Sequence, residues 1–219
     1  VENGDGGGGD GATPSDAAGA DAQGYGDGAV DLQNDPNNCG TVGRVCSSNR
    51  CQGGDCVRRV FVSNGRAHGT FGGAAGADTQ CMGSAQGPGL KGTFFAWIST
   101  STSSPQTHFT KGTAPYVLVD GTTEVAKDFA HLAGTNQTVA LEHAIDHDEN
   151  GAPIASGVVW TATQPDGTFS GAPDCSDFAA SPVDPTAQTG DSSQVNTNWT
   201  ESTTSTTCAT LAHFYCVEQ

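Results

Sequence analysis

The chain has 219 residues, enough for one large domain or for one medium domain with appendages. Its apolar fraction of 35% is low for a globular chain, and its 31 glycines indicate that part of it packs no core of its own. Eight basic against 24 acidic residues give a formal net charge of -16. A field of that sign repels polyanions and anionic headgroups, which disfavours DNA, RNA and heparin-like partners. Cations, basic proteins and neutral glycans remain candidates.

The cysteines indicate an exported protein. No C-x-x-C pair is present, so the usual spacings of zinc ribbons and thioredoxin-like proteins are absent. An even set of widely spaced cysteines is typical of disulfides formed in an oxidising compartment. The eight are Cys39, Cys46, Cys51, Cys56, Cys81, Cys175, Cys208 and Cys216.

Two further patterns bear on localisation. No apolar run is long enough for a transmembrane helix. No signal peptide is present either, so we expect an exported chain to have been processed before Val1, where a lipid-modified cysteine would fit. The expected location is extracellular or on the cell surface, associated with the outer membrane if the source is bacterial.

Residues 1–38 form an acidic segment of Gly, Ala and Asp, with eight acids and no Lys or Arg. Such a composition cannot bury enough apolar surface to offset its ordering entropy. We therefore expect a flexible acidic tether. The alternative is a tail that becomes ordered on a neighbouring subunit.

Residues 39–59, the Cys-rich segment, hold four cysteines spaced C-x6-C-x4-C-x4-C. A segment this short has almost no core, so cross-links must hold it together. Three pairings are open, and we favour Cys39–Cys51 with Cys46–Cys56. The segment resembles short Cys/Gly stretches of secreted proteins from myxobacteria-like organisms.

The Cys-rich segment is also basic. Its four arginines and one aspartate give a local charge of +3, whereas residues 60–219 carry 15 acids and 4 bases, or -11. We therefore hypothesise that the segment docks on the acidic module, with Arg58 and Arg59 in the contact. A solvated basic face is the alternative.

Residues 60–219 form one expected domain. A helix begins at Gly73 and ends before Gly87-Pro88-Gly89, with small residues on one face at Ala77, Cys81 and Ala85. A second, short helix is expected from Glu124 to Leu132. We expect strands at 60–62, 93–99, 116–121, 158–163 (a central strand) and 213–218.

Two connections complete this reading. Residues 164–167 read Gln-Pro-Asp-Gly, which predicts a tight turn. The Ser/Thr/Asp-rich residues 181–207 hold few apolar side chains and predict a long loop. We expect a ligand to bind through this loop and through residues 101–115.

Three motifs in this order resemble endostatin, the C-terminal module of certain collagens with a C-type-lectin-like fold. They are GTFGGAAGADTQCMGSAQGPGLKGTFFAWIS, VVWTATQPDGTFSGAPDC and CATLAHFYCVEQ. Leptospiral endostatin-like surface proteins look closer still. The resemblance implies an α+β fold with a mixed, mostly antiparallel sheet, two short helices and long loops. It also implies the disulfides Cys81–Cys216 and Cys175–Cys208.

Function does not transfer with a fold. Calcium-dependent sugar binding in C-type lectins uses a Q-P-D-like loop, but here Gln164-Pro165-Asp166 falls in the tight turn. The expected W-N-D motif is replaced by Asn198-Trp199-Thr200. Trp199 lies between polar residues, so we expect it to be exposed and able to anchor a partner; a residue folded back on the domain is the alternative.

The stretch 142–151 is the most polar. Asp146, Asp148 and Asn150, followed by glycine, match the opening of an EF-hand loop, which indicates calcium, although the closing acid is missing. His143 and His147 could chelate zinc if they were helical. A plain acidic turn at Asn150-Gly151 is the favoured interpretation.

No catalytic motif, such as G-x-S-x-G or H-E-x-x-H, is present, so we predict no enzyme activity, no catalytic residue and no cofactor other than calcium. The sequence predicts an exported cell-surface or extracellular adhesion protein that binds a protein or glycan. The alternative is a self-assembling extracellular subunit of a filament or coat, whose tail contacts neighbouring copies.

Overall fold

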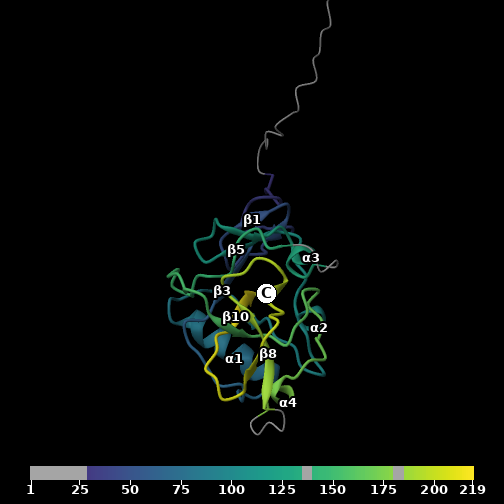
Figure 1. Ribbon diagram of the computed structural model, residues 1–219. Coiled ribbons are helices and arrows are strands. Elements are labelled where there is room, and N and C mark those ends of the chain that lie inside the picture. Colours follow the sequence, from purple (N-terminus) through teal and green to yellow (C-terminus); the bar gives the residue numbers. More distant parts are fainter. Residues whose placement is uncertain (1–28, 135–139, 180–184) are drawn as a thin grey trace, which may run out of the picture. The chain divides into compact units, whose positions relative to one another are not determined.

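The computed structural model describes residues 29–134, 140–179 and 185–219. The chain divides into two units, Val1–Val30 and Asp31–Gln219, and the second holds all the helices and strands of the described residues (Figure 1). Most of the expected acidic tail, residues 1–28, lies outside the described residues. None of the described helices is long and apolar enough to cross a membrane.

Residues 31–38 of the expected tail belong to the second unit. Three of their carbonyl groups accept hydrogen bonds from the Cys-rich segment. The N–H of Gly40 donates to Leu32, that of Cys46 to Pro36 and that of Gly54 to Gln33. Composition alone could not show these bonds, since backbone carbonyls are common to all residues.

The Cys-rich segment contains one hairpin, formed by β1 (Cys51–Gln52) and β2 (Asp55–Cys56). Gly53 and Gly54 connect the strands with φ angles of 61° and 78°. Two consecutive left-handed residues are typical of the tight hairpin turn that favours glycine.

The central sheet has five strands, and β10 lies between β4 and β3. Only β3 and β5 pair in parallel; the other neighbours are antiparallel. The mixed, mostly antiparallel α+β architecture expected from the sequence is therefore confirmed. In sheet order the strands are β4 (Phe94–Ala96), β10 (Tyr215–Glu218), β3 (Arg58–Val62), β5 (Tyr116–Leu118) and β6 (Glu124–Ala126).

The sheet separates two apolar cores because successive side chains of a strand point to opposite faces. Val60 and Val62 of β3 belong to the first core, with Trp97 and Tyr116. Phe61 belongs to the second core, which α1 covers.

Helix α1 (Gly73–Gln86) matches its expected bounds, and Ala77, Cys81 and Ala85 are buried against the sheet, as expected. Small residues on this face let the helix backbone approach β4 and β10 closely. Gly76 makes a different close contact, with the segment that precedes α1: a Cβ built there would lie 1.8 Å from the carbonyl oxygen of Phe71.

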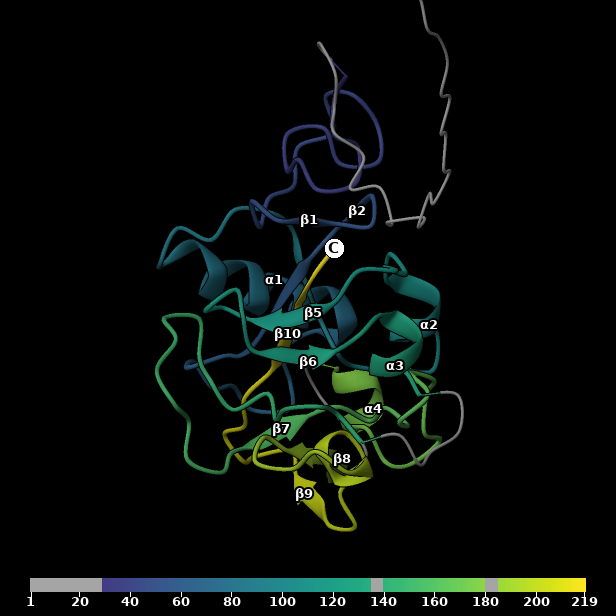
Figure 2. The same ribbon diagram turned by 90° about the horizontal axis from the view of Figure 1, so that it is seen from above.

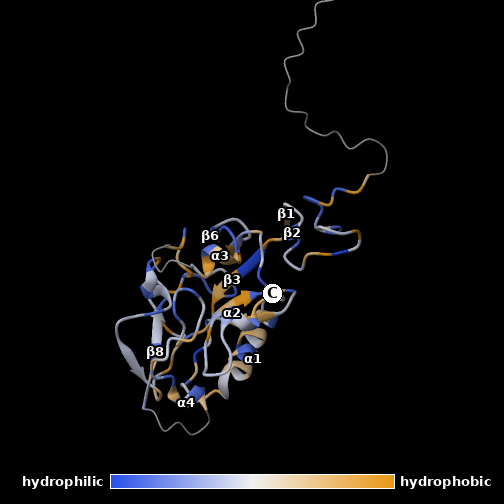
Figure 3. Ribbon diagram, turned by 90° about the vertical axis from the view of Figure 1, so that its right-hand side faces the viewer, coloured by the Kyte–Doolittle hydropathy of each residue, from blue (hydrophilic) through white to orange (hydrophobic). Residues whose placement is uncertain are grey.

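A second sheet has three antiparallel strands, β7 (Val158–Trp160), β8 (Thr186–Asp191) and β9 (Ser205–Thr207). It lies at the end of the second unit away from β1 and β2 (Figure 2). The expectation of a loop over 181–207 is therefore wrong where the structure describes it. β8 is pale in Figure 3, which is coloured by hydropathy. It lacks the alternation of apolar and polar residues by which a strand can be predicted from a sequence. β7, expected to be central, is an edge strand of this sheet.

The expected helix from Glu124 to Leu132 is instead the strand β6 followed by one helical turn, α3 (Phe129–Leu132). Asp128 separates them, since its side chain caps α3 by accepting from the N–H of His131. Val125, Phe129 and Leu132 are buried in this segment.

The remaining helical elements are single turns: α2 (Pro105–His108), α4 (Cys175–Phe178) and η1 (Thr197–Trp199). The described residues thus contain one helix of 14 residues and several single helical turns, whereas two short helices were expected. In α4 all four residues have φ between 52° and 59°, which makes it a left-handed turn. The tight turn at 164–167 is confirmed by the bond from the Gly167 N–H to the carbonyl of Gln164.

Candidate binding site

The four disulfides have the pairing expected from the sequence. Cys39–Cys51 and Cys46–Cys56 hold the Cys-rich segment together. Cys81–Cys216 joins α1 to β10, and Cys175–Cys208 joins α4 to the chain after β9. No described cysteine is free.

Trp199 is not exposed. Only 2% of its surface is accessible, and its ring lies 4.9 Å from that of Trp97 and 5.3 Å from that of Tyr215, measured between centroids. The expectation of an exposed anchor is therefore wrong, and the alternative of a residue folded back on the domain is confirmed. The burial of Trp199 could not be predicted from its polar neighbours Asn198 and Thr200, because the side chains that it contacts are distant in sequence.

The predicted calcium ligands lie in a tight turn. The carboxylate of Asp148 accepts hydrogen bonds from the N–H groups of Asn150 and Ala152, and its carbonyl accepts from Gly151. These bonds are those of the plain acidic turn. Asp146 lies 2.6 Å from Nδ1 of His147 and 3.8 Å from that of His143, so it is oriented toward the histidines.

This arrangement does not bring together a set of ligands for calcium or for zinc among the described residues. Among the described residues, the only group of three His, Cys, Asp or Glu side chains close enough to share an ion is Cys39, Cys46 and Cys56. Their sulfurs are all in disulfides. Calcium binding at Asp146, Asp148 and Asn150 stays a prediction, and so does zinc at the histidines.

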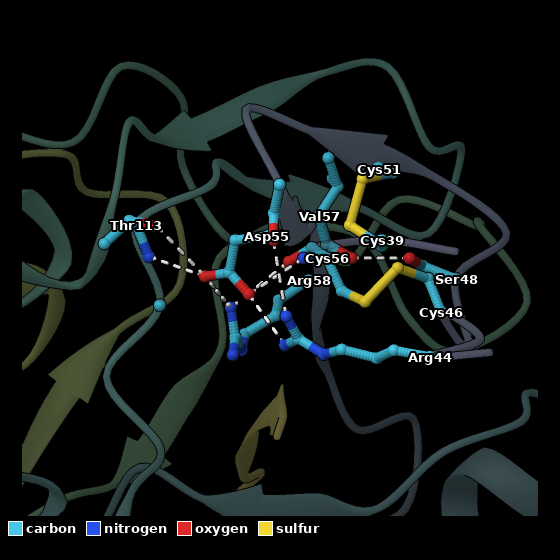
Figure 4. Close-up of polar contacts among 12 residues, drawn as sticks. Cys39, Arg44, Cys46, Ser48, Cys51, Asp55, Cys56, Val57, Arg58 and Thr113 are labelled. Carbon is cyan, nitrogen blue, oxygen red and sulfur yellow. Dashed lines mark hydrogen bonds and ion pairs between the residues drawn. A yellow bond between two sulfur atoms is a disulfide. The ribbon is translucent and has the colours of Figure 1, made fainter. Parts of the chain in front are cut away.

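Asp55 joins the Cys-rich segment to the module (Figure 4). Its carboxylate lies 2.9 Å from Arg44 and 3.2 Å from Arg58, and it accepts a 2.8 Å bond from the N–H of Thr113. Burial works against its ionisation, but these partners outweigh burial and hold the pKa of Asp55 well below its usual range. One carboxylate therefore faces two guanidinium groups, and this cluster keeps a net positive charge.

The side chain of Arg58 is buried where it pairs with Asp55. Its side chain is 4% exposed, and its guanidinium lies 6.0 Å from the ring centroid of Tyr116. Gly112 makes room for it, since a Cβ there would lie 2.0 Å from Nη1 of Arg58. Any larger residue at 112 would have to displace the guanidinium of Arg58.

Arg59 makes the second junction, with the buried Glu218 of β10. Nε and Nη2 of Arg59 each lie 2.8 Å from a carboxylate oxygen of Glu218, a bidentate pair. The hydroxyl of Ser47 also donates to Glu218. The pair of Arg59 and Glu218 fits the hypothesis that the basic Cys-rich segment docks on the acidic module. The expected contact of Arg58 is different, because Arg58 pairs with Asp55 of the segment itself.

A groove of about 560 Å³ lies where the Cys-rich segment meets the loop after α1. Hydroxyl and amide groups form part of its lining. They come from Ser47, Ser48, Asn37 and Asn49, beside Arg59 and Lys91. Because Arg59 is already paired with Glu218, Lys91 contributes the net charge of this groove.

A second groove, of about 430 Å³, lies on the other side of the same loop, and we call it the acidic groove. Pro88, Leu90 and Val119 supply apolar walls, and Leu90 and Val119 also pack against the second core. Asp120 and Glu149 supply carboxylates. Its volume falls in the range of about 300–1,000 Å³ that is usual for ligand sites.

The carboxylates of the acidic groove accept hydrogen bonds from hydroxyl and N–H groups. Burial of Asp120 is outweighed by hydrogen bonds from Thr123 and Thr122, which lower its pKa to about 2. Glu149 accepts a 2.8 Å bond from the N–H of Asn64. Within the described ranges, neither acid lies within ion-pair distance of Lys, Arg or His.

The sequence did not predict this groove, because three separate connections build it. Glu149 belongs to the polar stretch 142–151, whereas Asp120 follows β5 and Leu90 follows α1. A useful signal would have been that each acid adjoins a strand or turn end near an apolar residue, as in Val119-Asp120.

Neither the models of known protein families nor the curated proteins include a match to this chain. The resemblance to endostatin-like modules stays a prediction.

Proposed function

We propose that this chain is an exported, non-enzymatic binding protein of the cell surface or extracellular space. Its acidic groove takes a basic segment of a partner protein. The observation that carries this proposal is the pair of uncompensated carboxylates, Asp120 and Glu149, beside the apolar walls of Leu90 and Val119. A Lys or Arg side chain fits that chemistry, because its aliphatic stem packs on apolar surface while its charged head meets carboxylate.

The charge of the whole chain supports the same class of ligand. A net charge of -16 attracts cationic partners and speeds their encounter. Four disulfides support an oxidising, extracellular location. The non-enzymatic part of the proposal rests on the sequence, which lacks the catalytic motifs sought.

The endostatin-like, C-type-lectin-like assignment belongs to the proposal too. It is supported by the mixed sheet and by the disulfide that joins α1 to the last strand, as the resemblance implies. The loops at 101–115 and 181–207 are not part of the proposed site, because the acidic groove has a different lining.

Surface plasmon resonance with two peptides tests the groove. One peptide alternates Lys or Arg with Val, and the other replaces each base with Glu. We expect only the basic peptide to bind, and to bind more weakly as salt rises, since exposed charges are screened. The double variant Asp120→Asn/Glu149→Gln should bind about tenfold more weakly, a loss of about 1.4 kcal/mol.

The matched control is Asp166→Asn/Glu201→Gln, which removes two charges from residues outside the groove lining. If both double variants bind equally well, net charge alone attracts the peptide and the groove is not the site. If the basic peptide does not bind the unchanged chain at low salt, the proposal fails.

A further inference from the structure

The Cys-rich segment exposes an apolar tip, residues 41–45. Val42 is 72% exposed and Val45 is 66% exposed, the two largest values among the large apolar side chains of the described residues. Between them stands Arg44, whose side chain is 43% exposed. Exposed apolar side chains around a charged one are typical of an interaction surface.

The tip is held in one conformation. The N–H of Arg44 donates to the carbonyl of Thr41, and the N–H of Cys39 donates to the carbonyl of Arg44. The disulfides Cys39–Cys51 and Cys46–Cys56 hold both sides of the tip. A rigid tip loses little conformational freedom when it binds, which favours association.

The tip region is positively charged in a chain that is otherwise acidic. Asp55 can neutralise only one of Arg44 and Arg58, so that cluster retains one positive charge. Arg50 adds a second charge: it is exposed and has no ion-pair partner within the part of the chain that the structure describes. Valine side chains beside guanidinium groups have the chemistry that the acidic groove is proposed to take.

We infer that the partner of the acidic groove is a second copy of this chain, which inserts its Cys-rich tip. Val42 and Val45 of one copy meet the apolar walls at Leu90 and Val119 of the other. The positive charge of the tip meets Asp120 and Glu149. This inference rests on the proposed function and names the ligand of the same groove. It makes the protein homophilic, able to join copies displayed on neighbouring surfaces.

Sedimentation velocity of the full chain, over a range of concentrations at low and high salt, tests the contact. We expect reversible self-association when salt is high enough to screen the repulsion between two chains of net charge -16, and weaker association when still higher salt screens the contact itself. Val42→Asp should weaken it about tenfold, equivalent to about 1.4 kcal/mol. Val195→Asp makes the same chemical change at another exposed valine, away from the tip, and should leave association unchanged.

A charge exchange makes the test specific. Arg50→Glu alone and Glu149→Arg alone should each weaken self-association, because each places like charges across the contact. An equimolar mixture of the two variants should associate again, since each tip then faces a groove of opposite charge. Recovery in the mixture also shows that both variants are folded.

Two outcomes overturn the inference: a chain that stays monomeric at every concentration and salt tested, or association that Val42→Asp and the charge exchange leave unchanged. If the basic peptide binds the groove while the chain stays monomeric, the proposed function stands and the homophilic contact is wrong. If neither the peptide nor a second copy binds, both proposals fail.

Discussion

Asp55 faces Arg44, Arg58 and the N–H of Thr113 together. Loss of its charge would leave the guanidinium of Arg58 buried without a counter-ion. Removing one partner of a buried pair costs more than the pair contributes, since the other charge stays desolvated.

Asp55→Asn is therefore expected to lower the free energy of unfolding by about 2 kcal/mol at neutral pH. Folding lowers the pKa of Asp55, so its contribution is full above the usual value of 3.8 and is lost as pH falls through the folded value. The difference in the free energy of unfolding between the unchanged chain and Asp55→Asn should be constant at neutral pH and should become smaller below pH 3.8. Urea unfolding over a range of pH measures this difference. Glu201→Gln, which removes an acid without a described ion pair, should show no such dependence.

Single residues also show which features could be predicted from the sequence and which could not. Asp55 is the one acid among the four arginines of residues 39–59, and that contrast could have marked it as their partner. The burial of Trp199 had no such signal, because the rings that pack on it come from Trp97 and Tyr215. Local polarity predicts exposure only when the chain does not fold back on a remote core.

Among the elements, α1 shows how glycine can be required at one position and unfavourable at another. A Cβ on Gly76 would collide with the backbone of Phe71, whereas a Cβ on Gly83 would meet nothing within 4 Å. Glycine in a helix interior costs about 1 kcal/mol relative to alanine.

Gly83→Ala should accordingly raise the free energy of unfolding by about 0.5–1 kcal/mol. Gly76→Ala should lower it by about 1–3 kcal/mol, because the helix must move away from Phe71 to admit the methyl group. Thermal and urea unfolding of the two variants measure both changes in the free energy of unfolding, which should have opposite signs. Destabilisation by Gly83→Ala would show that the open space beside it is not present in solution.

Apolar strands and helix ends were readable from the sequence, whereas polar strands were not. The strands at 60–62 and 213–218 contain the apolar residues Val60, Phe61, Phe214 and Val217, and the structure has β3 and β10 there. β8 and β9 consist mainly of Thr, Ser, Gln and Gly, and they form strands because they pair with each other and with β7. Pairing between remote segments leaves no periodic pattern in such residues.

For the whole molecule, the disulfides differ in how much of the unfolded chain they restrict. Cys81–Cys216 spans 135 residues, whereas Cys46–Cys56 spans 10. In the loop-closure model the first contributes about 5 kcal/mol and the second about 3 kcal/mol.

Removal of each pair by double alanine substitution tests this order. Cys81→Ala/Cys216→Ala should lower the free energy of unfolding more than Cys46→Ala/Cys56→Ala, by about 2 kcal/mol. Urea unfolding of both variants under non-reducing conditions measures the difference. An equal or opposite order would show that native contacts, and not restriction of the unfolded chain, set the stabilisation.

The position of β10 determines when the protein can fold. β10 follows every other strand in the sequence, yet it lies between β4 and β3, and β4 has no other partner in its sheet. Until Tyr215–Glu218 have been synthesised, β4 cannot join the central sheet and the cysteine at 216 cannot meet its partner on α1. Closure of the sheet and formation of the disulfide with the longest loop therefore depend on the same late segment of the chain.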